Sequence, residues 1–182
     1  MKTLKDILIP TIALFLICFL VTALLGTVNL VTEPIIAETA AGIQDEACGR
    51  VLQGAAGFES IDETAYKGVD TQGKTVGYVI IASSTGYGGE IKLMVGINAE
   101  GVVQGVEILS MSETPGLGAN AKKDKFISQY KGKDANKGEL KVSKDGGEID
   151  AITAATISSR AVTQGVNQAL ERYKELSGKA GV

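Results

Sequence analysis

The chain has 182 residues, a formal net charge of -3, no histidine, no tryptophan and only 5% aromatic residues. A sequence without a basic excess and with few aromatic side chains gives no support to nucleic-acid binding. Without histidine the chain lacks the commonest general base and a favoured transition-metal ligand. We therefore predict neither a catalytic residue nor a metal site. The length suits one domain, or one domain with an anchor.

The N-terminal stretch is predicted to cross a membrane once. The 26 residues Ile7–Thr32 contain no charged side chain, and about 20 apolar residues suffice to span the hydrocarbon core. A cleaved signal peptide is the alternative, but its apolar region is typically only about 7–15 residues long. We therefore favour an uncleaved anchor.

The charges that flank this stretch predict its orientation. Lys2 and Lys5 precede it, whereas Glu33 and Glu38 follow it. By the positive-inside rule the N-terminus stays in the cytoplasm and the rest of the chain is exported. The predicted location is the cell (inner) membrane, with a single pass and an extracytoplasmic domain.

A second helix, beginning at Pro34, is predicted to connect the anchor to the exported domain. Its apolar residues recur near helical spacing at Ile35, Ile36, Ile43, Ala47, Val51 and Leu52. This stripe packs either on the domain or on a neighbouring subunit, and the pattern does not decide between them. The predicted parts are residues 1–32 for the N-terminus and membrane helix, 33–57 for the connecting helix and 58–182 for the domain.

The domain begins with a predicted meander of antiparallel strands. Segments rich in β-branched and apolar residues occur at Tyr66–Val69, Gly77–Ser83, Ile91–Asn98 and Val102–Met111. The sequences at 71–74 and 98–101 are typical of hairpin turns. Apolar alternation in the last strand is imperfect, which favours either cover on both faces or a bulge at Gly105.

Helices are predicted to flank this sheet, so the fold class is α+β. Ala119–Tyr130 is amphipathic, with an apolar side made by Phe126, Ile127 and Tyr130. Residues 131–147 are polar and turn-rich, with one short strand at Leu140–Val142. Ile157–Leu176 has the apolar stripe of a long amphipathic helix.

Three segments stand out as candidate binding elements. Thr85–Glu90 and Ser112–Gly118 are glycine-rich, which serves either turns with positive φ or close approach of the backbone to a flat ligand. Asp150–Thr156 is small and hydroxyl-bearing and directly precedes the last helix. Unpaired N–H groups and the helix dipole at such a start suit an anion, although an ordinary helix cap has the same pattern.

Together these segments resemble the FMN-binding domain shared by the G subunit of the Rnf ion-translocating electron-transport complex and the C subunit of the sodium-pumping NADH:quinone reductase. The matching stretches are Gly86–Ile91, Ser112–Gly118 and Asp150–Thr156. The third is similar to the motif of flavin transferase, usually Asp-x-x-Ser/Thr-Gly/Ser-Ala-Thr, with Ala154 at the position where the family usually has Gly or Ser. Because the exported domain is compact, the Rnf G subunit is the better match.

The resemblance implies a covalently bound FMN. In the family, the last threonine of the motif is esterified by the phosphate of FMN, which a separate flavin transferase delivers from FAD. Carried over, the acceptor is Thr156, and Asp150 serves recognition by the transferase. The implied cofactor-binding residues are Thr156, Thr153, Ala155, Asp150, Glu113, Thr114, Gly116, Leu117, Gly118 and Tyr87.

The resemblance also implies an electron carrier within an ion-translocating oxidoreductase, a translocase that couples ferredoxin:NAD⁺ electron transfer to Na⁺ or H⁺ movement. Implied partners are the other Rnf subunits (A, B, C, D and E), especially the membrane-embedded D subunit and the iron–sulfur membrane subunits, and the flavin transferase. The alternatives are a non-redox scaffold or assembly subunit and the C subunit of the quinone reductase. A stand-alone flavin reductase is least favoured, because no G-x-G-x-x-G follows a strand.

Overall fold

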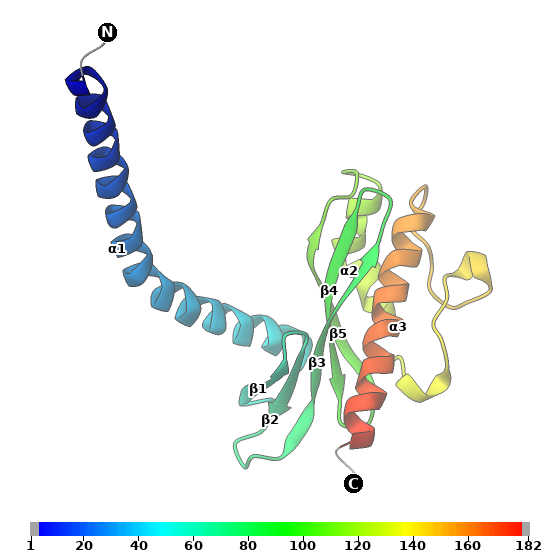
Figure 1. Ribbon diagram of the computed structural model, residues 1–182. Coiled ribbons are helices and arrows are strands. Elements are labelled where there is room, and N and C mark those ends of the chain that lie inside the picture. The colour runs from blue at the N-terminus through cyan, green and yellow to red at the C-terminus, as the bar shows by residue number, and fades with distance from the viewer. Residues whose placement is uncertain (1–3, 180–182) are drawn as a thin grey trace. The chain divides into compact units, whose positions relative to one another are not determined.

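A computed structural model of the protein divides into two compact units, residues 1–44 and 45–182 (Figure 1). It describes the backbone of residues 4–179 and the side chains of this range except those of 4–7, 10, 27–45 and 179. One helix, α1 (Leu4–Val51), contributes to both units. It covers the predicted membrane helix and most of the predicted connecting helix as a single helical element.

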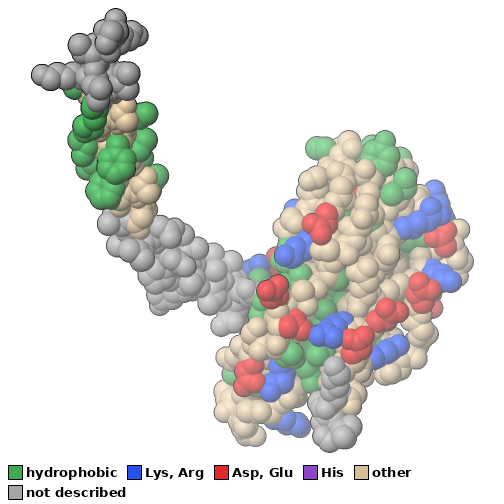
Figure 2. All heavy atoms as spheres, in the orientation of Figure 1, with side chains coloured by type: hydrophobic (Ala, Val, Ile, Leu, Met, Phe, Trp, Pro, Cys, Tyr) green, Lys and Arg blue, Asp and Glu red, His purple; other side chains and the backbone are tan. Residues whose placement is uncertain are grey.

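In the first unit, the described part of α1 exposes large apolar side chains (Figure 2). The most exposed are Ile9, Leu14, Phe15, Leu20, Leu24 and Leu25. Within the described residues, the structure has no helix whose length and apolar character suffice to cross a membrane. The predicted span Ile7–Thr32 falls partly on residues 27–32, whose side chains lie outside the described set.

The second unit is built on a five-stranded antiparallel sheet with the order β1-β2-β3-β4-β5. Its strands are β1 (Gly57–Asp62), β2 (Ala65–Val69), β3 (Thr75–Thr85), β4 (Glu90–Asn98) and β5 (Val103–Met111). Sequential strands are neighbours, so the predicted meander is confirmed and each of its four predicted strands is present. The edge strand β1 was missed because it is largely polar and half of its residues are exposed.

Bulges explain the imperfect alternation in β5. The register between β4 and β5 shifts at two places, which leaves Gln104 and Leu109 as extra residues of β5. The first lies next to Gly105, where a bulge was predicted. An extra residue interrupts the alternation between the two faces of the sheet, and the extra residue Leu109 is 36% exposed.

Two predictions on the segment after the sheet were wrong. The predicted helix Ala119–Tyr130 is broken into η1 (Gly118–Lys122), α2 (Asp124–Ile127) and η2 (Ser128–Tyr130), because Lys123 is extended between the first two, with ψ 141°. The predicted strand Leu140–Val142 is reduced to one isolated bridge between Val142 and Ile149. Short 3₁₀ turns, η3 (Ala135–Lys137) and η4 (Ser143–Asp145), occupy the rest of this stretch.

Helix α3 (Thr156–Lys179) packs on one face of the sheet and forms the main core with it (Figure 1). The core side chains of α3 are Ala161, Val162, Val166, Ala169, Leu170 and Tyr173. Tyr130 from η2 is fully buried against this helix, and its hydroxyl lies 2.8 Å from Oγ1 of Thr163. The predicted helix Ile157–Leu176 and the α+β class are therefore confirmed.

The end of α1 packs on the opposite face, in a groove made by glycines. A Cβ at Gly96 would overlap the carbonyl oxygen of Val51, and a Cβ at Gly105 would lie 3.0 Å from its Cα. Val51 and Leu52 are 2% and 1% exposed, and Arg50 donates two hydrogen bonds of 2.9 Å to Glu107 of β5. The last apolar positions of the predicted connecting helix therefore pack on the domain itself.

We predict that Gly96→Ala destabilises the domain by about 1–3 kcal/mol, because the added methyl group forces the end of α1 away from the sheet. Chemical denaturation of the full chain measures this change. Gly57→Ala is the matched control, because a Cβ there meets no atom within 4 Å. Equal free energies of unfolding for the two variants would contradict the packing described.

Candidate functional site

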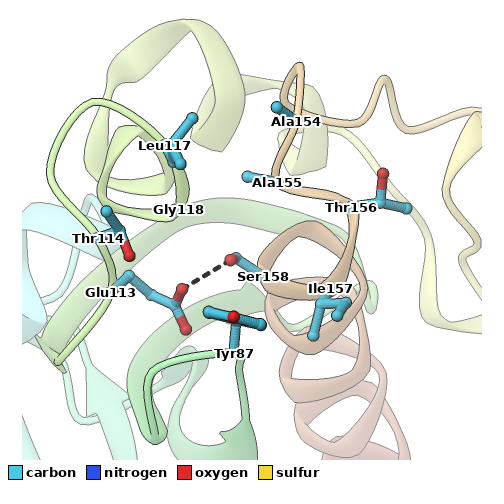
Figure 3. A pocket seen from close by; sticks show the side chains of 10 residues that line it. All are labelled: Tyr87, Glu113, Thr114, Leu117, Gly118, Ala154, Ala155, Thr156, Ile157 and Ser158. Atoms are coloured by element: carbon cyan, nitrogen blue, oxygen red, sulfur yellow. Dashed lines mark hydrogen bonds between the residues drawn. The ribbon is translucent and has the colours of Figure 1, made fainter.

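Three loops meet at the N-terminal end of α3. They are the β3–β4 loop at 86–89, the loop 112–117 that follows β5, and the loop 150–155 that leads into the helix. Residues of these loops and of the first turns of η1 and α3 line a cavity of about 450 Å³ (Figure 3): Tyr87, Glu113, Thr114, Leu117, Gly118, Ala154, Ala155, Thr156, Ile157 and Ser158. The structure thus brings the three motif segments, far apart in the sequence, to one place.

Thr156 is the first residue of α3 and is partly buried at the cavity wall. The first N–H groups of a helix have no partner within it, and the dipole is positive there. Small side chains surround this start: Ala154 is exposed and Ala155 is 7% exposed. The helix start is therefore open to an anionic group placed on or near the Thr156 hydroxyl.

Ala154 has φ 59°, the only positive φ of a non-glycine residue in the part of the chain that the structure describes. This left-handed conformation costs an L-residue roughly 1–2 kcal/mol. Glycine adopts it freely. The backbone thus gives a physical reason for glycine at this position of the motif.

Glu113, in the loop after β5, joins that loop to the β3–β4 loop and to the first turn of α3. Its side chain is buried, with 8% of the residue exposed. Oε2 accepts a 2.8 Å hydrogen bond from the Ser158 hydroxyl, and Oε1 accepts a 3.0 Å bond from the Gly88 N–H. A Cβ at Gly86 or Gly118 would overlap the carboxylate oxygens. These two glycines therefore make room for Glu113, a role that neither predicted explanation of the glycine-rich loops had identified.

The mouth of the cavity is apolar. Tyr87 is 74% exposed, Ile157 51% and Leu117 42%; they come from the β3–β4 loop, the first turn of α3 and the loop after β5, respectively. Large exposed apolar side chains gathered at one site are typical of ligand or partner binding. A flat, mainly apolar ring fits between such side chains.

A second cavity, of about 700 Å³, lies on the other side of Leu117 and Ala154, which line both cavities. Predicted site residues therefore fall into two groups. Tyr87, Glu113, Thr114, Leu117, Gly118, Ala155 and Thr156 line the first cavity. Gly116, Asp150 and Thr153 line the second.

Ile157 and Ser158 also line the first cavity but were not predicted as site residues. Both lie in the first turn of α3, where the residues after a binding threonine face the same cavity. Ile157 is the first apolar residue of the predicted amphipathic helix Ile157–Leu176, but its side chain is exposed and does not belong to the core. The start of the helix was the signal that could have found them.

One ion pair and one buried hydrogen bond connect α3, which carries Thr156, to neighbouring segments. Arg160 of α3 donates hydrogen bonds of 2.7 and 2.6 Å to Asp145. These bonds hold the pKa of that carboxyl below its usual value, because they favour its ionised form. Burial raises the pKa of Tyr130, so this phenol stays neutral beside Thr163.

Residues 86–171 match the model of a family described as an FMN-binding domain. The match begins at the first motif segment and includes the whole site. The fold and the site thus define a flavin-binding protein class.

Relatives along nearly the whole chain narrow this class. The G subunit of the proton-translocating ferredoxin:NAD(+) oxidoreductase complex of Clostridium ljungdahlii is 38% identical over 165 residues, which cover 88% of each chain. The G subunit of the Na(+)-translocating complex of Acetobacterium woodii is 36% identical and covers 90% of each. The chain belongs to the family of G subunits of ion-translocating ferredoxin:NAD(+) oxidoreductase complexes.

Solved structures agree on the fold. The crystal structure of Shewanella oneidensis NqrC matches with a TM-score of 0.50 and 25% identity over 58% of this chain and 54% of that one. The C subunit of the Na(+)-translocating NADH-quinone reductase of Parabacteroides distasonis matches with a TM-score of 0.53, at 22% identity over 62% of this chain and 61% of that one.

We predict that Ser158→Ala destabilises the domain by about 1–3 kcal/mol, because it removes a donor from the buried Glu113 carboxylate. Ser84→Ala is the matched control. Its hydroxyl is the one buried side-chain polar atom without a hydrogen-bond partner in the described residues, so its removal is neutral or stabilising. Denaturant titration compares the two variants, and a larger loss for Ser84→Ala would contradict this account.

Proposed function

We propose that this chain is the FMN-carrying electron-transfer subunit of an Rnf-type ferredoxin:NAD⁺ oxidoreductase coupled to Na⁺ or H⁺ translocation, and that its FMN is held covalently by Thr156. One observation carries the proposal: the three motif segments converge on one cavity, with Thr156 at the first turn of α3. The names of the relatives in the family support the type of complex.

The residues of the site fit FMN. The open start of α3 suits a phosphodiester, since its free N–H groups and dipole stabilise an exposed negative charge by about 0.3–1 kcal/mol. The apolar mouth made by Tyr87, Leu117 and Ile157 suits the isoalloxazine ring. When bound, the flavin supplies the redox chemistry, while the protein sets its position and potential. Electron transfer of this kind requires no general base, so a chain without histidine can serve it.

Attachment of the cofactor requires FAD and a flavin transferase. The Thr156 hydroxyl attacks the phosphorus of the FMN half of FAD, forming a phosphoester bond. The P–O bond of the pyrophosphate bridge breaks, AMP leaves, and the hydroxyl proton is released. Ala154 and Ala155 leave space around the acceptor for the transferase. Glu113 and Thr114 lie at the cavity wall, where they position the bound ring.

We further propose that the N-terminal part is a single-pass membrane anchor and that the domain lies on the extracytoplasmic side. The support is the uncharged run Ile7–Thr32 in the sequence and the exposed apolar side chains of the described part of α1. An exported domain has no FMN pool from which to replace a lost cofactor. Covalent attachment prevents that loss. The partners are then the other Rnf subunits, above all the membrane-embedded D subunit and the iron–sulfur membrane subunits.

Thr156→Ala is expected to abolish covalent flavin. Intact-mass analysis after expression with a flavin transferase measures one added FMN less one water on the parent chain, located on the Thr156 peptide. Thr71→Ala is the control, because Thr71 is an exposed threonine in the turn between β2 and β3, outside the three motif segments. A Thr156→Ala chain that still carried the same mass would overturn the assignment.

A non-redox scaffold subunit is the second candidate, favoured by one observation, the strained Ala154 in the motif. In-gel fluorescence of the denatured parent chain separates the two. A fluorescent band supports the flavoprotein, whereas a dark band after expression with the transferase supports the scaffold.

The anchor predicts one-sided labelling of intact cells. A Ser110→Cys variant, exposed on β5, is expected to react with a membrane-impermeant maleimide from outside, because the domain is exported. A Thr3→Cys variant is expected to react only after permeabilisation. The parent chain, measured alongside, accounts for Cys18 and Cys48, and the reverse labelling pattern would refute the orientation.

A further inference from the structure

The loop 150–155, which leads to Thr156, is held by two side chains that lie outside the motif. One is Gln129 of η2 and the other is Ser159 of α3. Together they bond both backbone groups of Asp150 and one backbone group each of Ile152 and Ala155.

Gln129 forms a reciprocal pair with the backbone of Asp150. Its Oε1 accepts from the Asp150 N–H at 2.7 Å, and its Nε2 donates to the Asp150 carbonyl at 3.3 Å. The neighbouring Tyr130 is fully buried in the core and reaches Thr163 of α3. Gln129 therefore fixes the start of the loop to an element that the core holds in place.

Ser159 holds the other end of the loop. Its hydroxyl oxygen accepts from the Ile152 N–H at 2.9 Å and donates to the Ala155 carbonyl at 2.9 Å. Ser159 is fully buried, so water does not compete for these two hydrogen bonds. The two bonded residues enclose Thr153 and Ala154, and the Ala155 N–H closes the same turn on the Ile152 carbonyl at 3.0 Å.

These bonds maintain an unfavourable backbone conformation. Ala154 has φ 59°, and a non-glycine residue stays in this region only when the surrounding structure over-determines it. If either set of bonds is lost, the segment before Thr156 can relax to other conformations. The position of the Thr156 hydroxyl relative to an incoming phosphorus then varies.

We propose that Gln129 and Ser159 are positioning residues for flavin attachment, holding the loop 150–155 in the conformation from which Thr156 is esterified. This inference rests on the proposed function. Neither residue touches the reacting atoms; each acts through the backbone of the loop. A misplacement of about 1 Å can lower a rate about 100-fold, so their loss lowers the turnover of attachment rather than the affinity for the acceptor chain.

The test is the kinetics of attachment on the full chain in detergent, with FAD and purified flavin transferase. Covalent flavin is followed by mass over a range of acceptor concentrations. Gln129→Ala and Ser159→Ala are expected to lower kcat by about 10–100-fold with little change in KM. Gln129→Glu, which keeps an acceptor for the Asp150 N–H, is expected to recover part of the rate.

Two matched controls are available on α3. Gln168→Ala removes an exposed glutamine, and Ser177→Ala removes a serine whose hydroxyl donates to a helix carbonyl, that of Lys174, at 3.3 Å. Both are expected to be modified at the parent kcat, because neither bonds the loop.

Hydrogen exchange on the chain without flavin gives a readout independent of loading. The Asp150 amide is expected to exchange faster in Gln129→Ala and the Ile152 amide faster in Ser159→Ala, while amides of β4 keep the parent rate. Unchanged exchange of the loop amides would overturn the proposal, because the bonds would then not hold the loop.

The kinetic outcomes separate this inference from the proposed function. If the parent chain gains no flavin on Thr156, the proposed function fails. If the parent is modified there and Gln129→Ala and Ser159→Ala match its kcat, the function stands and the positioning role is refuted. If Ser159→Ala does not fold, the test rests on Gln129, which is only half-buried. The kcat values of Gln129→Ala and Gln129→Glu are then compared with that of the parent chain.

Discussion

The buried carboxylate of Glu113 is the interaction on which the rest of the site depends. It accepts from Ser158 at the start of α3 and from Gly88 in the β3–β4 loop, so one side chain joins two loops to the helix. A buried carboxylate is tolerated only when donors satisfy it. The energetic penalty of leaving it unsatisfied therefore holds both loops against the helix and keeps the cavity between them open.

The glycines of this chain serve the same kind of close approach in two places. Gly86 and Gly118 leave room for Glu113 at the site, whereas Gly96 and Gly105 form the groove that receives the end of α1. In both places a methyl group would displace a backbone or a buried charge. These four glycines thus serve tertiary packing, whereas eight others in the described residues have the positive φ that turns require.

Much of the fold could be predicted, because the strands and α3 bury strongly apolar, periodic sequences. The failures lie where periodicity is a weak guide. β1 is a polar edge strand held by pairing to β2. The predicted helix Ala119–Tyr130 is broken at Lys123, although Phe126 and Tyr130 after the break keep the spacing of a helix face and are in edge-to-face contact, with ring centroids 5.7 Å apart. Of the site, the motif residues were predicted, but four others were not. Ile157, Ser158 and Ser159 look like ordinary residues of α3. Gln129 is 21 residues away in the sequence from Asp150, whose backbone it bonds.

The sequence by itself determined the order of strands and helices, the family and the residues of the motif, because local patterns and short contiguous segments carry that information. Only the tertiary structure decided that the three segments share one cavity and that Glu113 joins two loops to the start of α3. It also decided that the motif passes through a left-handed Ala154 in a loop bonded by Gln129 and Ser159. The physical reason is that these are hydrogen bonds and exclusions of volume between residues far apart in the chain. The secondary-structure propensity of a local segment describes neither these hydrogen bonds nor these exclusions of volume.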